Sequence, residues 1–146
     1  MRVLFDTNVV LDVLLAREPH ALVAAQLMAM ADGGAIEGVV SATTVTTIHY
    51  IAAKAVGREA AGGRVRELLA IFDVACVDRD VVVSALDAGF ADYEDAVVHE
   101  AGRADSVAAI VTRNGKDFES ATIPVFDPNE LLAALVASSQ TQAAER

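Results

Sequence analysis

The 146-residue sequence predicts an α/β fold, a three-layer α/β/α sandwich around a mostly parallel sheet of four to five strands. Two observations lead to this prediction. Short apolar runs bounded by turn residues alternate with longer segments whose apolar residues recur at helical spacing. The composition is 54% hydrophobic but only 5% aromatic, which suits strands that Val, Leu, Ile and Ala cover on both faces. Helices between the strands act as crossovers, so the sheet is expected to be parallel.

Local signals bound the expected elements in order along the chain. Gly33-Gly34 ends the second helix and Gly57 the third. Pro124 favours an edge position for the last strand, because proline cannot donate to a central ladder. Asp127 is an expected N-cap, with Pro128 at the first helical position. The expected strands are 2–5, 36–41, 73–77, 106–111 and 123–126, and the expected helices are 8–15, 21–30, 43–56, 64–72, 79–88, 93–104 and one that begins at Pro128.

A single domain is expected over residues 1–137, followed by a polar tail, 138–146, that we expect to be disordered. The longest apolar runs are far too short to cross a bilayer, so no membrane association is expected. Met1 leads directly into a strand without a signal peptide, which favours a cytoplasmic protein. Cys76 lies in an apolar run and is expected to be buried as a small hydrophobic residue.

The net charge of −10 limits how the chain could bind nucleic acid. Proteins that bind nucleic acid by charge alone carry a basic surface. Nucleic-acid chemistry here would need bound cations, a partner that supplies positive charge, or a local basic strip. The residues available for such a strip are Arg17, Lys54, Arg58, Arg64, Arg66 and Lys116.

Acidic residues fall where the expected sheet presents the ends of its strands. Ligands of open parallel sheets bind beyond the carboxyl ends of the strands. Asp6 directly follows the first strand, and Asp117 lies shortly after the fourth. The helix at 93–104 runs antiparallel to the strands, so its acidic start, 92–95, is expected at the same edge. These carboxylates are therefore expected to converge.

Each of these acids also has an ordinary structural explanation. Asp6 could be an N-cap, and Asp92 and Asp95 are spaced as in a capping box. Gathered at one site, however, carboxylates repel and raise one another's pKa, and a divalent cation relieves that repulsion. All-oxygen ligands suit Mg²⁺ or Mn²⁺. A zinc site is not expected, because the chain has one cysteine and its three histidines are scattered.

Three segments resemble the motifs of PIN-domain nucleases, including the VapC toxins. Phe5-Asp6-Thr7-Asn8-Val9-Val10-Leu11-Asp12 looks like the family's opening motif. Asp95-Ala96-Val97-Val98 resembles its third acidic motif, and Val111-Thr112-Arg113-Asn114-Gly115-Lys116-Asp117-Phe118 resembles its fourth. The resemblance spans about residues 1 to 135. The form Asp92-Tyr93-Glu94-Asp95 is similar to a subgroup with an acidic pair at this point.

The resemblance implies a metal-dependent endoribonuclease that uses Mg²⁺ or Mn²⁺. It implies that Asp6, Asp95 and Asp117 are the catalytic and metal-binding residues, and that Asn8, Glu94, Thr112 and Asn114 support them. The implied partners are an RNA substrate, an antitoxin protein if the chain is the toxin of a toxin–antitoxin pair, and a second copy in a homodimer. The apolar helices at 21–30 and 45–56 could carry the dimer contact, although burial within the monomer explains them equally well.

One position departs from the family's pattern. A glutamate is usual about six residues after the serine that ends the second strand, whereas Thr47 stands six residues after Ser41. A hydroxyl is a poor substitute for a carboxylate as a metal ligand. The site could use Glu94 or Asp92 instead, bind one metal rather than two, or be weakened.

Other interpretations remain open. The chain could be a PIN-like module that binds nucleic acid or protein with little catalysis, and Thr47 is the main support for this alternative. It could also be an unrelated doubly wound fold, such as a phosphotransfer receiver or an Asp-nucleophile phosphatase, but Asn8 stands where the phosphatase needs aspartate. Arg113 is expected to be a surface or ion-pairing residue rather than a phosphate contact. His99 is expected at the surface or beside the site rather than as a general base.

Overall fold

A five-stranded parallel sheet forms the centre of the molecule. The computed structural model describes residues 1–145, and its strands follow the order β3-β2-β1-β4-β5, every neighbouring pair being parallel. The strands are β1 (Arg2–Phe5), β2 (Glu37–Ser41), β3 (Asp73–Ala75), β4 (Ala109–Val111) and β5 (Val125–Phe126). The α/β class and the parallel sheet predicted from the sequence are confirmed.

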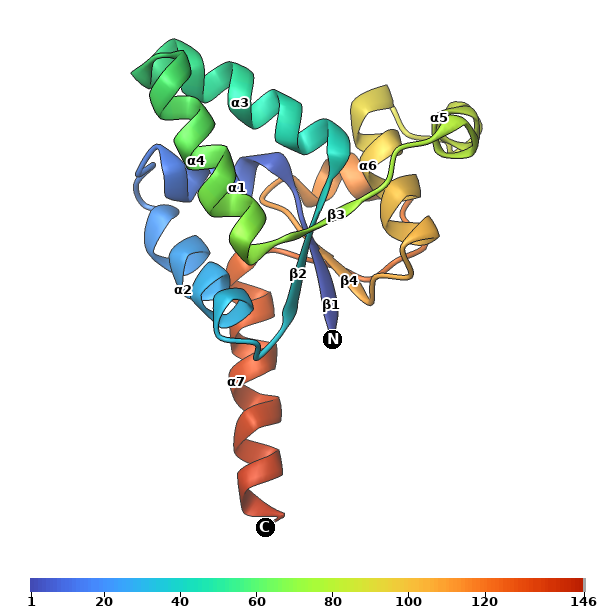
Figure 1. Ribbon diagram of the computed structural model, residues 1–146. Helices are drawn as coiled ribbons and strands as arrows, with labels where there is room; N and C mark the ends of the chain where they lie inside the picture. The colour runs from blue at the N-terminus through green and yellow to red at the C-terminus, as the bar shows by residue number, and fades with distance from the viewer. Residues whose placement is uncertain (146) are drawn as a thin grey trace.

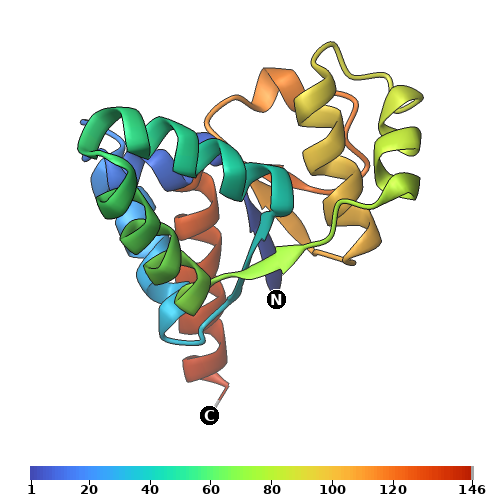
Figure 2. The same cartoon turned by 45° about the horizontal axis from the view of Figure 1, so that its top comes forward.

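Helices cover both faces of this sheet and complete the three layers (Figures 1 and 2). One layer contains α1, α2, α3, α4 and α7, and the other contains α5 and α6. The helices are α1 (Thr7–Leu14), α2 (Ala21–Asp32), α3 (Ala42–Val56), α4 (Arg58–Ile71), α5 (Arg79–Leu86), α6 (Tyr93–Ala104) and α7 (Pro128–Ala144), with a short 3₁₀ helix, η1, at Gly115–Phe118.

The two faces of β1 show why the strand sequences are apolar throughout. Val3 and Phe5 pack into the core beneath α1 and α2, whereas Leu4 packs into the core beneath α5 and α6. All three side chains are fully buried. Because side chains alternate across a strand, a strand between two helical layers must be apolar at every position.

Helix α4 begins six residues earlier than the sequence suggested. Gly57 has a φ of +90°, which ends α3, and its carbonyl accepts the N–H of Ala61 as α4 begins. The helix then continues through Gly62 and Gly63, which favoured a later start because glycine is a poor helix former. Packing of α4 on α3, through the fully buried Ala61 among others, outweighs that local preference.

The C-terminal tail was expected to be disordered from residue 138, and this prediction is wrong for residues 138–144. Helix α7 starts at a capping box formed by Asp127 and Glu130 and continues to Ala144. No Gly or Pro interrupts it after Pro128, so nothing in the sequence ends the helix. It extends past the amino ends of the strands (Figure 1), and every residue after Leu135 is exposed up to residue 145. Residue 146 lies outside the described residues.

Cys76 is exposed, so the expectation that it is buried was also wrong. Cys76 directly follows β3, the strand at one edge of the sheet, and the preceding Ala75 points inward and is fully buried. Alternation then directs the next side chain outward. Within residues 1–145, no helix is long and apolar enough to span a membrane.

The strand order places a switch point beside β1. The connections from β1 to β2 and β3 move towards one edge of the sheet, whereas β4 and β5 lie on the other side of β1. In doubly wound sheets, the loops diverge at such a point and open a crevice at the carboxyl ends of the strands. Here that crevice lies beyond Phe5 and Val111, the paired last residues of β1 and β4.

Candidate metal centre

An acidic cleft lies at this switch point. Its volume is about 320 Å³ and it is bordered by side chains from β1–α1, α3, the start of α6 and the segment after β4. Among the described residues that line it, five carry carboxylates and one, Arg17, is a cation. The lining residues are Asp6, Thr7, Asn8, Leu11, Arg17, Ile51, Asp92, Glu94, Asp95, Val98, Asn114 and Asp117. The structure thus brings the three predicted catalytic aspartates to one cleft.

Asp6 forms the floor of the cleft and is only 6% exposed. It is the N-cap of α1, with Oδ1 accepting the Thr7 N–H at 2.9 Å, while Oδ2 accepts the Thr112 hydroxyl at 2.7 Å. Burial raises the pKa of Asp6, the two hydrogen bonds oppose that rise, and the charges of Glu94 and Asp117 add to it. The capping role and a place in the acidic cleft are therefore compatible.

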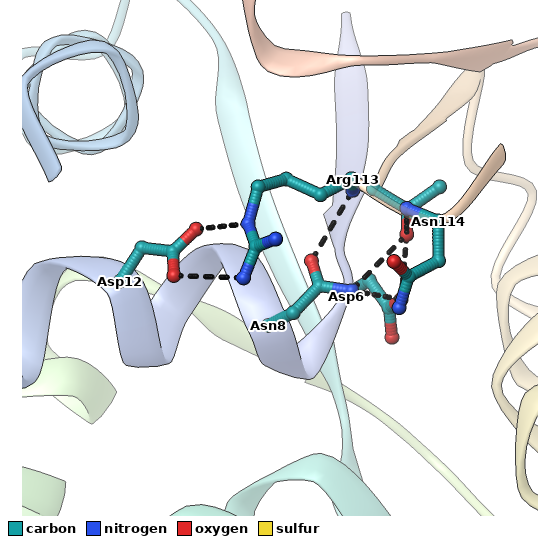
Figure 3. Close-up of polar contacts among 6 residues, drawn as sticks. Asp6, Asn8, Asp12, Arg113 and Asn114 are labelled. Carbon is teal, nitrogen blue, oxygen red and sulfur yellow. Dashed lines mark hydrogen bonds and ion pairs between the residues drawn. The ribbon is translucent and has the colours of Figure 1, made fainter. Parts of the chain in front are cut away.

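Asn8 and Thr112 connect the two strand ends around Asp6, and Figure 3 shows Asn8 between Asp6 and Arg113. Asn8 Nδ2 lies 3.2 Å from Asp6 Oδ2 and 3.4 Å from Thr112 Oγ1, and its Oδ1 accepts the Arg113 N–H at 3.3 Å. Thr112 is fully buried, and its Oγ1 also accepts the Asn114 N–H at 3.1 Å. These contacts restrict the rotation of the Asp6 carboxylate.

The start of α6 supplies the second group of acids. Asp92 is the N-cap and accepts the Asp95 N–H at 3.0 Å, so Asp92 has the capping role expected from the sequence. Burial, together with the nearby charges of Asp6, Asp92, Asp117 and Glu94, raises the pKa of Asp95 to about 7. Asp95 therefore exchanges its proton near neutral pH when no cation neutralises its neighbours.

Asp117 reaches the cleft from η1, where it is exposed. Its backbone N–H donates to the Asn114 carbonyl at 2.9 Å, which fixes the turn that carries it. Asn114 lines the cleft, but within residues 1–145 its side-chain amide makes no hydrogen bond to a site carboxylate. The amide contact expected from Asn114 is therefore not formed, whereas the one from Asn8 is.

Glu94 lies opposite the threonine that replaces the usual glutamate. The Thr47 hydroxyl is 3.4 Å from Glu94 Oε1 and 3.1 Å from the Thr43 carbonyl, so its single proton is shared between two acceptors. Glu94 is therefore the carboxylate beside position 47, although it belongs to α6 rather than α3.

The donor set fits a hard divalent cation. All the candidate ligands are carboxylate or amide oxygens, which Mg²⁺ and Mn²⁺ prefer, and within the described part of the chain the buried Asp6 carboxylate has no cationic partner in its contacts. In residues 1–145, no three carboxylate, imidazole or thiol side chains already stand close enough to share one ion. Asp6 is fixed, so binding would require the more exposed acids to rotate towards it.

Comparison with known families identifies the fold. A family model described as PIN domain matches residues 2–116, well over half of the sequence. The chain belongs to the PIN domain family. The family membership excludes the receiver and phosphatase alternatives left open by the sequence.

Solved structures share this fold. A chain in the structure of VapBC2 from Rickettsia felis bound to a promoter DNA fragment has a TM-score of 0.67 at 12% identity, with 87% of this chain and 98% of that chain covered. A chain in a toxin–antitoxin complex from Klebsiella pneumoniae has a TM-score of 0.64 at 25% identity, with 86% of this chain and 97% of that chain covered. A chain in the structure of VapBC-1 from nontypeable Haemophilus influenzae has a TM-score of 0.66 at 15% identity, with 88% of this chain and 99% of that chain covered. Among curated proteins, none matches the sequence significantly.

His99 and Arg113, which the sequence analysis considered beside the site residues, do not line the acidic cleft of this PIN domain. His99 is 2% exposed and packs against Phe90, and its Nε2 accepts the Thr122 N–H at 3.0 Å, so the expectation that it lies at the surface was wrong. Arg113 forms an ion pair with Asp12, in agreement with the ion-pairing role expected for it.

Asp12 was not singled out by the sequence analysis. It is fully buried in α1, at a position bracketed by Val9–Leu11 and Val13–Leu15. A charged residue inside such an apolar run needs a buried partner. That signal indicated that a partner exists but not which residue it is.

Proposed function

We propose that this PIN domain is a metal-dependent endoribonuclease that uses Mg²⁺ or Mn²⁺. The observation that carries the proposal is the buried Asp6 carboxylate in a cleft that also contains Asp95 and Asp117. Burial and mutual repulsion raise the pKa of both Asp6 and Asp95. A protein that keeps such a cluster loses stability unless a cation compensates it, so the arrangement favours a metal-binding function.

In this proposal Asp6, Asp95 and Asp117 hold the ion, and Glu94 joins them from α6. A bound ion of this kind lowers the pKa of coordinated water and neutralises charge on the phosphate. Asn8 and Thr112 keep Asp6 oriented through their contacts with its Oδ2. Arg17 lines the same cleft and would contact the phosphate of the bound nucleic acid.

RNA is the proposed substrate because the three motifs resemble those of PIN-domain ribonucleases. Hydrolysis adds the oxygen of water to phosphorus and breaks one phosphodiester P–O bond. The net charge of −10 makes general attraction to RNA unfavourable. Binding then depends on the ion, on Arg17 and on the basic residues of α3 and α4.

The toxin of a toxin–antitoxin pair is the proposed biological role. It is supported by the similarity to chains in VapBC and other toxin–antitoxin structures. An antitoxin protein would then be the partner, and co-expression of its gene should relieve any growth arrest that this chain causes. We also propose a homodimer, although Leu27, Met28 and Ile48 of α2 and α3 are already buried within the monomer.

One observation favours a second candidate, a binding module with little catalysis. Thr47 replaces the usual acid, and Glu94 compensates from a different helix rather than from the same position. Mn²⁺ binding at Asp6 and Asp95 supports the nuclease, whereas a chain that binds RNA but no Mn²⁺ supports the module.

The test is cleavage of 5′-labelled single-stranded RNA by the purified chain. We expect cleavage with Mg²⁺ or Mn²⁺, none with excess EDTA, and recovery when the metal is restored. A matched single-stranded DNA of the same sequence tests the preference for RNA. Cleavage that persists in EDTA, or its complete absence with both metals, would contradict the proposal.

A further inference from the structure

The ion pair between Asp12 and Arg113 lies on one side of Asn8, and Asp6 lies on the other (Figure 3). The Arg113 guanidinium donates Nε–H to Asp12 Oδ2 and Nη2–H to Oδ1, the latter at 3.1 Å, so the contact is bidentate. Asp12 is completely buried and Arg113 is about one quarter exposed. Bidentate arginine–carboxylate contacts fix orientation as well as charge.

This ion pair joins the two segments that carry the site. Asp12 lies one helical turn after Asn8 on α1, the helix that Asp6 caps, whereas Arg113 is the second residue after β4. The Arg113 backbone N–H donates to Asn8 Oδ1, and Asn8 in turn contacts Asp6. The segment from Thr112 to Asp117 is therefore attached to α1 by both the backbone and the side chain of Arg113.

The direction of the Arg113 side chain argues against a phosphate contact. Arg113 does not line the acidic cleft. It borders a different hollow of about 210 Å³, together with His20, Val23, Asp127, Pro128 and Asn129. Two of its three guanidinium nitrogens face Asp12, which neutralises its charge.

We propose that Asp12 and Arg113 are positioning residues that hold Asp117 at the right place relative to Asp6 for shared metal binding. This inference rests on the proposed function, because positioning matters only if the two acids act on the same ion. Neither residue touches the substrate. Residues that orient metal ligands from behind typically change metal affinity by about 10- to 100-fold when altered.

The test is the Mn²⁺ affinity of the Arg113→Lys variant without RNA, measured by calorimetry or electron paramagnetic resonance. Lysine keeps the charge but not the bidentate geometry. We expect the Kd for Mn²⁺ to rise by about tenfold or more in Arg113→Lys. Asp12→Asn should produce a similar rise, and the double variant should show no larger rise than either change alone. Arg2→Lys is the matched control: Arg2 is equally exposed and paired with Asp105, but lies at the opposite end of β1. Its Mn²⁺ affinity should equal that of the wild type.

Three outcomes would overturn the positioning role. Unchanged Mn²⁺ affinity with weaker RNA binding and a shallower salt dependence would make Arg113 a phosphate contact. Unchanged Mn²⁺ affinity with only a lower melting temperature would show that the ion pair stabilises the fold without affecting metal binding. An equal loss in Arg2→Lys would show that general destabilisation is responsible.

Failure of the proposed function is distinguishable from failure of this inference. If the wild type binds no Mn²⁺, the nuclease proposal fails, and hydrogen exchange then decides whether the ion pair holds the segment that carries Asp117 in place. The Asn114 and Asp117 N–H groups, bonded to Thr112 Oγ1 and the Asn114 carbonyl, report the order of the segment. Faster exchange in Arg113→Lys than in Arg2→Lys would support the inference, and equal exchange would refute it. If Asp12→Asn does not fold, Arg113→Lys alone carries the test.

Discussion

The Thr47 hydroxyl of α3 lies 3.4 Å from Oε1 of Glu94, an α6 residue that lines the acidic cleft. Two helices on opposite faces of the sheet thus meet at the position where the motif resemblance leads us to expect a glutamate. A carboxylate is present there, but it comes from a different element.

Exchanging the acid between these two positions tests whether Glu94 substitutes for the missing residue. Glu94→Gln removes one metal-facing charge and should lower cleavage by about 10- to 100-fold in kcat/KM. Adding Thr47→Glu to that variant restores an acid at the same point and should recover much of the loss. Cleavage assays at several Mn²⁺ concentrations measure both effects. No loss in Glu94→Gln would show that Glu94 is only a surface acid, and Glu119→Gln serves as an exposed control outside the cleft.

Asp95 makes the stability of the metal-free protein fall as pH rises. Its pKa is about 7 in the folded chain and about 4 in an unfolded one. Between these values the folded state keeps a proton that the unfolded state has lost, so the free energy of unfolding decreases as pH rises through this window. His99, whose pKa is lowered by burial, opposes this trend, because its folded form stays neutral where the unfolded form is protonated. In EDTA, the change in melting temperature from pH 5.5 to pH 7.5 should therefore be more negative for the wild type than for a variant without the Asp95 carboxylate.

Asp95→Asn removes this pH dependence and separates stability from function. The variant should be more stable than the wild type at pH 7.5 in EDTA, should not show the decrease in stability that Asp95 causes as pH rises, and should lose activity. Because Mn²⁺ binds the ionised carboxylates, its stabilisation of the wild type should be larger at pH 7.5 than at pH 5.5. Identical pH profiles for the two proteins would show that Asp95 ionises normally.

Two glycines test the packing that supports the sheet. A Cβ added to Gly38 in β2 would lie 2.7 Å from the Phe72 ring, which is buried against Phe5. Gly38→Ala should therefore cost about 1–3 kcal/mol of stability through overpacking. Gly62→Ala is the matched change, since its Cβ meets nothing within 4 Å, and it should stabilise α4 by about 0.5–1 kcal/mol. Chemical denaturation measures both, and equal effects at the two positions would contradict the packing described here.

Much of the fold was predictable because its signals are local. The apolar run at β1 ends at Asp6, and Asp127-Pro128 starts α7 as its capping residues indicated. The parallel sheet followed from the alternation of strands and helices, and the meeting of Asp6, Asp95 and Asp117 followed from the rule about strand ends. The start of α4 was missed because packing on α3 outweighs the low helix propensity of Gly62 and Gly63. The end of α7 was missed because the polar composition after residue 137 favoured disorder, although no Gly or Pro interrupts the helix.

The contacts within the site were less predictable because they join distant parts of the chain. Asp12 and Arg113 are 101 positions apart, and nothing in their local sequences pairs them. The position of His99 beneath Phe90 depends on how the loop after α5 folds back. Thr47 and Glu94 could each be identified from the motif, but their proximity required the structure.

The most direct test of the central claim is the activity of Asp6→Asn. Asp6 contributes the buried carboxylate around which the cleft is built, and asparagine keeps its size while removing the charge. The account predicts that folded Asp6→Asn, verified by circular dichroism, neither binds Mn²⁺ nor cleaves single-stranded RNA with Mg²⁺ or Mn²⁺, whereas the Arg2→Lys control cleaves like the wild type. Unchanged metal-dependent cleavage by Asp6→Asn would contradict it.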